Sequence, residues 1–277
     1  MSAAVVDDEL AQFLEVVFRT YHHDFRLYAI ASLKRRLSVA LIHFGASSLG
    51  ELAARIERDS AAFTQLLRFL TVQVSDLFRD PSYFRAIRET VVPHLSTFPS
   101  LKVWVPGCAT GEEAYSLAIL LHEEGVLDRT LIYATDISPD ALRTAADGIY
   151  HITRFTRFTS NYLIAGGKAS LSEYYTARYS SVMFDRRLRK SILFSEHSLA
   201  TDGAFAEVQL VSCRNVLIYF DRQLQNRAVG VLRDSLCDGG FLGLGNRESL
   251  AVTGHSAEFR DLVPEERIYE RVQAPSD

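Results

Sequence analysis

The chain has 277 residues, of which 48% are apolar and 23% charged, a composition that supports one large or two ordinary folded domains and argues against intrinsic disorder. Its 34 acidic and 30 basic residues give a net charge of −4, which excludes a general attraction to nucleic acid or to an anionic membrane. Its three cysteines are widely spaced and form no CxxC pair, which excludes a disulfide scaffold and a zinc domain, so no metal site is expected.

The N-terminal part of the chain, residues 1 to 75, is predicted to form an all-α domain. Its first ten residues carry acids where a secretory signal would carry Lys or Arg, and no run of about 18 apolar residues occurs anywhere. These features indicate a cytoplasmic protein without a membrane-inserted segment. Further along, apolar residues recur every three or four positions, which is the spacing of helices. Ser48 and Glu51 fit a capping box at a helix N-terminus, and Asp80 before Pro81 fits a second helix start.

One of these helices, Arg26 to Leu41, has an apolar stripe along one face. Lys34, Arg35 and Arg36 follow one another in it with no acid among them. Two interpretations remain open. The charge pattern alone favours an ordinary solvated face, and the alternative is a docking face for an acidic partner.

From residue 101 the pattern changes to strands that alternate with helices. The stretches LKVWVPG, LIYATD, VQLVSC and FLGLG are the predicted strands, and a helix follows each of the first three. This alternation predicts a parallel sheet covered on both faces, in a second domain of residues 76 to 277. Residues 150 to 194 interrupt it with Tyr and Phe interleaved with Arg, and we predict an insertion with short strands of its own. An aromatic mini-core with solvated arginines is the favoured interpretation of that insertion.

The turn after the first predicted strand, in GCATGEEAYS, carries Gly107 and Gly111. Glycine allows the tight turn and the close approach of a ligand that such a position needs. The next helix opens with Glu112 and Glu113, where a dinucleotide would place its pyrophosphate, and two carboxylates there would repel phosphate. We therefore expect a ligand without phosphate groups.

Polar residues also end the next predicted strands. Asp136, at the end of the second, either accepts hydrogen bonds from ribose hydroxyls or caps the following helix, and both interpretations remain open. Arg214, Asn215 and Tyr219 follow the third, at the edge where open α/β sheets bind ligands. A nucleoside with a positive charge and no phosphate fits the glycines and acids at this edge, and S-adenosylmethionine is such a molecule.

Five stretches of the sequence resemble the CheR family, the methyltransferases that esterify glutamate side chains on bacterial chemoreceptors. They are SDLFRDPSYF, VWVPGCATGEEAYSLAILL, IYATDI, CRNVLIYFD and DGGFLGLGNRESL. The resemblance runs from about residue 10 to residue 270 and is highly specific in GCATGEE and CRNVLIYFD. It implies an α/β fold: a class I S-adenosylmethionine-dependent methyltransferase domain, Rossmann-like, with an inserted small β-subdomain, preceded by the all-α domain.

The resemblance also implies roles for individual residues. Arg79, in the match to the family's T-x-F-F-R-[DE] motif, and Tyr219 are the implied catalytic residues, which would orient the target carboxylate. The structural alternatives are that Arg79 pairs only with Asp80 or Asp76, and that Tyr219 only closes the core. The implied cofactor-binding residues are Gln73, Ser75, Arg79, Gly107, Glu113, Asp136, Ser198, Leu199, Arg214 and Asn215. At Ser198 the family usually has Asn.

The implied substrates are S-adenosylmethionine, converted to S-adenosylhomocysteine, and glutamates on the cytoplasmic helical hairpin of a chemoreceptor. A glutamate carboxylate is already ionised at neutral pH, so we expect catalysis by positioning and desolvation without a general base. An acidic receptor helix raises the docking interpretation of Lys34, Arg35 and Arg36 above the solvated one. The enzyme is expected to be a monomer with no nucleic-acid partner.

Two other functions remain open. A nucleic-acid methyltransferase would use the Tyr- and Arg-rich insertion to grip its substrate, but the chain has no DPPY-type motif. A non-catalytic module would bind S-adenosylmethionine as a sensor, and the presence of Arg79 and Tyr219 counts against it.

Overall fold

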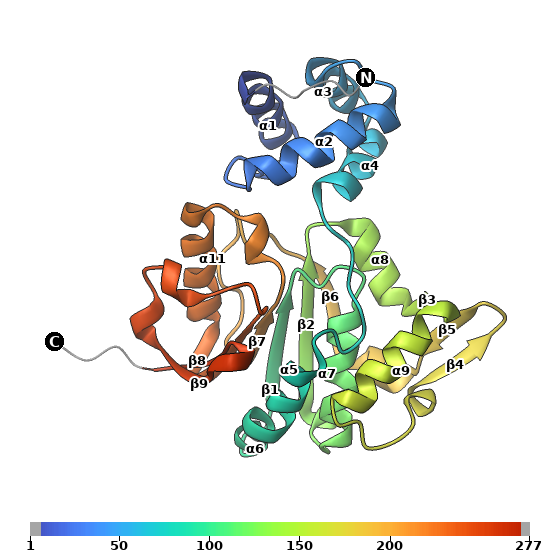
Figure 1. The fold of residues 1–277 in the computed structure, drawn as a ribbon, viewed down its shortest axis with the longest axis vertical. Helices are drawn as coiled ribbons and strands as arrows, with labels where there is room; N and C mark the ends of the chain where they lie inside the picture. Colours follow the sequence, from blue (N-terminus) through green and yellow to red (C-terminus); the bar gives the residue numbers. More distant parts are fainter. Residues whose placement is uncertain (1–6, 273–277) are drawn as a thin grey trace.

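The computed structural model describes residues 7–272, which form a helical domain joined to a larger α/β domain (Figure 1). The helical domain consists of α1 (Asp7–Tyr21), α2 (Ile30–Phe44), α3 (Leu49–Arg58) and α4 (Ser60–Leu70). Each helix turns a stripe of apolar side chains toward a shared core, as amphipathic helices do. The expectation of an all-α N-terminal region is confirmed.

The two predicted helix starts turn out differently. Ser48 caps α3 as predicted, because its Oγ accepts the N–H of Glu51 at 3.2 Å. Pro81 does open α5 (Pro81–Ala86), but Asp80 makes no capping hydrogen bond, so that part of the prediction was wrong. The carboxylate of Asp80 is drawn instead to the buried guanidinium of Arg214, at 2.7 Å.

The α/β domain is built on a seven-stranded sheet in the order β6-β2-β1-β7-β8-β10-β9. The strands are β1 (Leu101–Pro106), β2 (Thr130–Asp136), β6 (Ile192–Glu196), β7 (Val208–Cys213), β8 (Leu236–Leu244), β9 (Phe259–Val263) and β10 (Ile268–Arg271). The first five strands in the spatial order are parallel, and β10 is antiparallel to both of its neighbours. The four strands predicted from the sequence are confirmed as β1, β2, β7 and β8.

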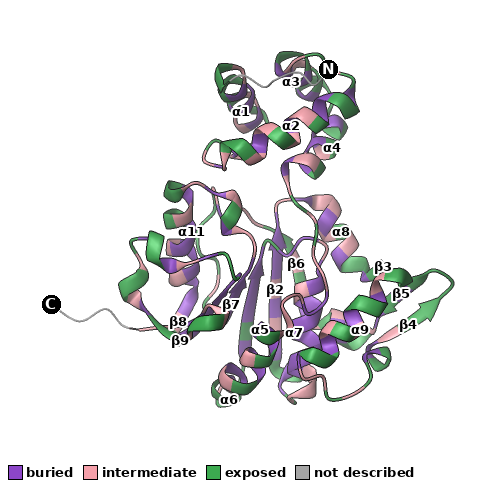
Figure 2. Ribbon diagram, in the orientation of Figure 1, coloured by how far each residue is buried: buried purple, intermediate pink, exposed green. Residues whose placement is uncertain are grey.

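Helices cover both faces of this sheet. They are α5, α6 (Val92–Leu95), α7 (Glu112–Glu123), α8 (Pro139–Asp147) and α11 (Arg222–Ser235), with a π-helical turn between α5 and α6 at Ile87–Val91. Alternate residues of each strand point to opposite faces. Trp104 and Val211 therefore pack with α11 and the helical domain in one apolar core, while Val103 and Leu210 pack with α7 in the other. Figure 2 shows β1, β2 and β7 almost wholly buried between these layers.

The expected insertion follows α8. It contains β3 (Ile149–His151), α9 (Phe155–Ile164), β4 (Tyr175–Arg178), β5 (Ser181–Phe184) and α10 (Arg186–Lys190). The three strands form a separate antiparallel sheet in the order β3-β5-β4. Phe158, Tyr162 and Phe184 are fully buried beneath it, as an aromatic mini-core requires. The next strand, β6, already pairs with β2 in the main sheet from Ile192 onward.

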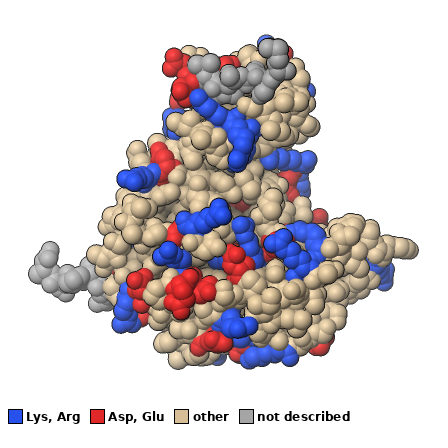
Figure 3. Space-filling view, viewed as in Figure 1, with Lys and Arg blue, Asp and Glu red and all other residues tan. Residues whose placement is uncertain are grey.

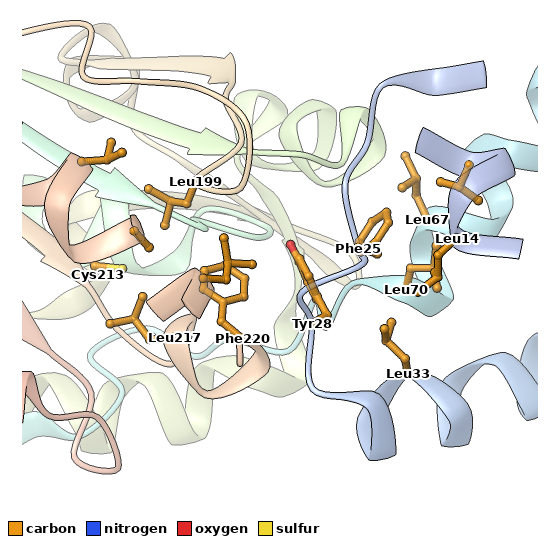
Figure 4. Packing of buried hydrophobic residues seen from close by; sticks show 14 of the residues in the cluster. Leu14, Phe25, Tyr28, Leu33, Leu67, Leu70, Leu199, Cys213, Leu217 and Phe220 are labelled. Carbon is orange, nitrogen blue, oxygen red and sulfur yellow. The ribbon is translucent and has the colours of Figure 1, made fainter. Parts of the chain in front are cut away.

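The two domains are joined by backbone hydrogen bonds where the loop between α1 and α2 contacts the loop after β7. Tyr28 forms an isolated antiparallel bridge with Phe220, and Ala29 donates its N–H to the carbonyl of Tyr219 at 2.8 Å. Figure 4 shows Tyr28 between the apolar side chains of the two domains. This pairing keeps the chain extended before Ile30, so α2 begins four residues later than the predicted Arg26.

No single helix among residues 7–272 is long and apolar enough to cross a membrane; α2 and α3 together reach that length and composition, but they are bent by 66°. Within the same residues no group of three or more His, Cys, Asp or Glu could hold a metal ion. The three cysteines are free.

Candidate functional site

Three adjoining clefts open at the carboxyl ends of β1, β2 and β7. The interdomain cleft, of about 580 Å³, is lined among others by Tyr28, Arg36, Asp136, Leu199 and Tyr219. The central cleft, of about 400 Å³, is lined among others by Ser75, Arg79, Gly107, Glu113, Arg214 and Tyr219. The arginine cleft, of about 910 Å³, is lined among others by Arg79, Arg157, Asn161, Asn246 and Arg247. Asn215 lines all three, so it stands where they meet.

The glycines of the first turn are where the sequence required them. Gly107 has φ +66°, and a Cβ there would lie 2.5 Å from the Cγ2 of Val216. Gly111 has φ +92°, and a Cβ there would lie 2.8 Å from the Cβ of Ala145. A side chain at Gly107 would be strained and would also collide with the loop after β7. The turn thus brings its backbone against the clefts.

The two acids at the start of α7 lie in different environments. Glu112 is fully buried and faces away from the clefts, where Arg154 Nη1 donates to it at 2.6 Å. Glu113 lines the central cleft, and its carboxylate accepts hydrogen bonds from the Ser212 hydroxyl at 2.7 Å and from Arg214 at 3.2 Å. Burial raises the pKa of Glu113, and Arg214 opposes that rise. The sequence argument therefore holds for Glu113 alone.

Asp136 ends β2 and does not cap the following helix. Ser138 is the cap of α8, since its Oγ accepts the N–H of Ala141. The carboxylate of Asp136 accepts the N–H of Ala109 and the N–H of Ser138, each at 2.9 Å. It thereby ties the end of β2 to the turn after β1. Burial raises the pKa of Asp136, and the backbone donors lower it.

Arg214 is the electrostatic centre of the site. Its side chain is 1% exposed and lies between two carboxylates, 2.7 Å from Asp80 and 3.2 Å from Glu113. Its guanidinium also stacks on the ring of Tyr83, at 4.2 Å from the ring centroid. Arg214 thus fixes Glu113 in the wall of the central cleft.

Glu248 was not singled out from the sequence, and it holds the whole loop after β7. It is 4% exposed, and its carboxylate accepts four backbone N–H groups, from Asn215 at 2.9 Å, Val216 at 2.8 Å, Ile218 at 3.3 Å and Gly245 at 2.6 Å. Asn215 has φ +61°, a strained conformation for a residue with a side chain. Glu248 supplies the bonds that keep this conformation. No pattern in the sequence marks such a backbone acceptor.

The two candidate catalytic residues are brought together in the central cleft. The side chain of Arg79 forms no ion pair among residues 7–272, and its one hydrogen bond there is to the carbonyl of Val74 at 3.5 Å. Its pairing with Asp80 or Asp76, the structural alternative, is therefore absent from the described residues. Tyr219 is half-buried, packs against the core and lines both the central and the interdomain clefts.

The basic residues of α2 do not share one surface. Arg35 is exposed, and Lys34 pairs with Asp7 at 2.8 Å. Arg36 points into the interdomain cleft, where its guanidinium lies 5.4 Å from the ring centroid of Tyr219 and hydrogen-bonds to the carbonyl of Leu70. Burial lowers the pKa of Arg36. The helix therefore contributes to the clefts as well as to the outer surface.

Two of the ten candidate cofactor residues, Gln73 and Ser198, do not line the clefts. The amide of Gln73 donates to the hydroxyl of Ser138 at 2.7 Å, which braces the start of α8. The hydroxyl of Ser198 accepts the N–H of Ala200 within its own turn. Neither side chain lines any of the three clefts. Their neighbours Val72 and Leu199 do line the interdomain cleft.

Comparisons with known proteins cover nearly the whole chain. Residues 8–71 match the model of the CheR methyltransferase, all-alpha domain, and residues 73–264 match that of the CheR methyltransferase, SAM binding domain. The Cher3 protein of Pseudomonas putida is 49% identical over 96% of this chain and 97% of its own length. The chemotaxis protein methyltransferase of Listeria monocytogenes is 28% identical over 88% of this chain and 91% of its own length. Chemotaxis protein methyltransferase 1 of Pseudomonas aeruginosa is 29% identical over 90% and 92%.

Proposed function

The chain belongs to the CheR methyltransferase family, and we propose that it transfers a methyl group from S-adenosylmethionine to glutamate side chains of cytoplasmic chemoreceptor helices. The observation that carries this proposal is the division of charge in the central cleft. The carboxylate of Glu113, whose side chain is 12% exposed, lies in one wall, and Arg79, which has no acidic partner in the described part of the chain, lies in another. A cation suits the first and a carboxylate suits the second. S-adenosylmethionine, expected from the sequence, is confirmed as the ligand of the matching domain.

The residues present fit this cofactor. The carboxylate of Glu113 would hold its amino group, and that of Asp136 its ribose hydroxyls, each beside the glycine turn after β1. Leu199 and Val216 would give an apolar surface for the adenine in the interdomain cleft. Bound there, S-adenosylmethionine supplies a methyl group on a positively charged sulfur.

The acceptor glutamate needs orientation more than activation. Its carboxylate is ionised at neutral pH, so no residue has to remove a proton. Arg79 and Tyr219 would fix the carboxylate for attack in line with the bond that breaks, and the products are a methyl ester and a neutral thioether. Val72, Val74 and Ile218 are exposed apolar residues that line the clefts and would shed water when a substrate covers them.

The decisive experiment transfers labelled methyl from S-adenosylmethionine to a receptor cytoplasmic fragment and then applies mild alkali. Label released as methanol is the expected result, because carboxyl methyl esters hydrolyse under these conditions. Label that survives alkali would point to N-methylation and overturn the proposal. Tight cofactor binding without transfer to any receptor fragment would favour a sensor.

Docking of the receptor through the outer face of α2 is expected to depend on Arg35. We expect Arg35→Glu to raise the KM for the receptor fragment about fivefold at low salt, with little effect in high salt, because an exposed charge is screened. Arg58→Glu, at the exposed end of α3, is the matched control and should leave KM unchanged. Equal KM values for the two variants at low salt would remove Arg35 from the docking surface.

Cofactor affinity is expected to fall in acid because of Glu113. Its raised pKa means that it takes up a proton at a higher pH than an ordinary glutamate and then loses the charge that attracts the amino group, which itself stays protonated. We expect the Kd of S-adenosylhomocysteine, measured by calorimetry, to rise about tenfold from pH 7 to pH 5. Glu113→Gln should bind weakly at both pH values. A variant that kept the full pH dependence would contradict this assignment.

The hydroxyl of Tyr219 is expected to matter less than its ring. In Tyr219→Phe the backbone bond to Ala29 and the contact with Arg36 both remain, so only the hydroxyl contact with the acceptor is lost. We expect kcat to fall about three- to tenfold with an unchanged Kd for S-adenosylhomocysteine. An unchanged kcat would show that the hydroxyl does not touch the acceptor.

A further inference from the structure

The arginine cleft lies beside the central cleft, and two of its residues, Arg157 and Arg247, have no part in the mechanism derived above. Four chain segments meet in it, which contribute Arg79 before α5, Arg157 on α9, Arg247 after β8 and Asn215 after β7. It shares Arg79 and Asn215 with the central cleft, so the two are continuous. Figure 3 shows basic side chains gathered across the middle of the face that this view presents.

The arginines that line this cleft outnumber the acids that pair with them in the described chain. Arg247 is exposed and has no ion pair or hydrogen bond among residues 7–272. The side chain of Arg157 is 71% exposed and forms one ion pair within residues 7–272, with Asp76 at 3.0 Å. Among the described residues that line the cleft, Asp80 is the one acid, and it is held by the buried Arg214. Of the three arginines in the cleft, Arg79 and Arg247 therefore have no acidic partner in the described chain, and Arg157 has one, Asp76.

We propose that the arginine cleft binds a second carboxylate of the substrate, on the same face of the receptor helix as the glutamate that is methylated. This inference rests on the proposed function. Residues three or four positions apart on a helix lie one above the other, about 5–6 Å apart, so a neighbouring acid can reach Arg157 and Arg247 while the target reaches Arg79. Guanidinium groups bind carboxylates through paired hydrogen bonds. The cleft thus selects which glutamate enters the central cleft.

The test measures methyl transfer to a receptor cytoplasmic fragment by the double variant Arg157→Gln, Arg247→Gln. Both side chains are exposed, so folding should be kept, which thermal unfolding checks. We expect KM for the fragment to rise about tenfold at low salt, kcat to change less than threefold, and the Kd of S-adenosylhomocysteine to stay the same. Arg186→Gln, an exposed arginine on α10 that lines none of the clefts, is the control.

A second fragment, with the acids around the target glutamate changed to amides, identifies the partner of the cleft. The KM of the wild-type enzyme for this altered fragment should rise about as much as the KM of the double variant rises for the original fragment. When the double variant is tested on the altered fragment, the two effects on KM should be less than additive. Additive losses, or an unchanged KM for the double variant, would overturn the second-carboxylate site while methyl ester formation still stands. Absence of alkali-labile transfer by wild-type enzyme would overturn the proposed function and this inference together.

Discussion

Replacement of Arg79 by alanine is expected to lower kcat for receptor methylation by about 100-fold or more, with a much smaller effect on cofactor affinity. The guanidinium of Arg79 lies in the central cleft without an acidic partner in the described chain, and its one hydrogen bond there, to Val74, is 3.5 Å long. Its charge is therefore available to the acceptor carboxylate. Loss of a preorganised donor at a reacting group costs about 10²–10³ in kcat in other enzymes.

Single-turnover methylation and calorimetry with S-adenosylhomocysteine separate the two effects. Arg79→Lys should recover part of the rate, because it restores the charge without the paired donors. Arg85→Ala removes an exposed arginine from α5 that lines none of the clefts, and it should behave as wild type. If Arg79→Ala turned over at the wild-type rate, the acceptor carboxylate would not need the charge of Arg79, and the mechanism would be refuted.

Glu248→Gln is expected to reduce both turnover and stability, although the change only replaces one carboxylate oxygen by an amide nitrogen. Each oxygen of Glu248 accepts two backbone N–H groups, so the new amide would direct its own hydrogens at two of these donors. Two buried donors would lose their acceptor, at about 1–3 kcal/mol each. The loop that carries Asn215 and Tyr219 would then relax from its strained conformation.

We expect kcat to drop about 100-fold and the free energy of unfolding to fall by about 2 kcal/mol or more, as measured by denaturant titration. Glu265→Gln, at an exposed position of the same C-terminal region, is the matched control. A variant with normal unfolding and normal turnover would show that the loop holds its shape without Glu248.

The sequence predicts the strands that are mostly buried. β1, β2, β7 and β8 are long apolar runs, whereas β6 and β9 each have only one buried residue, their first, so they carry no clear period. β10 has four residues, too few to show a period.

The residues of the candidate site also fall into a group that the sequence predicts and a group that it does not. Gly107 and Asp136 stand at strand ends and Glu113 in the first turn of α7, which follows β1, so topology alone brings them to one edge. The position of Arg36 in the interdomain cleft and the hydrogen bonds of Glu248 both depend on how distant segments pack. The helical period of a sequence shows which residues share one side of a helix, but it does not show which element that side contacts. The placement of Arg36 depends on the contact between the two domains, and that of Glu248 on the contact between the loops after β7 and β8.

The hydrogen bond between Ala29 and Tyr219 has a consequence for recombination within this family. A chimera that exchanged the helical domain at the end of α4 would import a new backbone partner for Tyr219 and a new neighbour for Phe220. Receptor choice and turnover would then change together. Exchange of α3 alone, which lies away from this contact, would alter the outer surface and leave the catalytic loop as it is. The receptor specificity of such a hybrid therefore depends on the backbone contact between the loop before α2 and the loop after β7, and not only on the segment that joins the two domains.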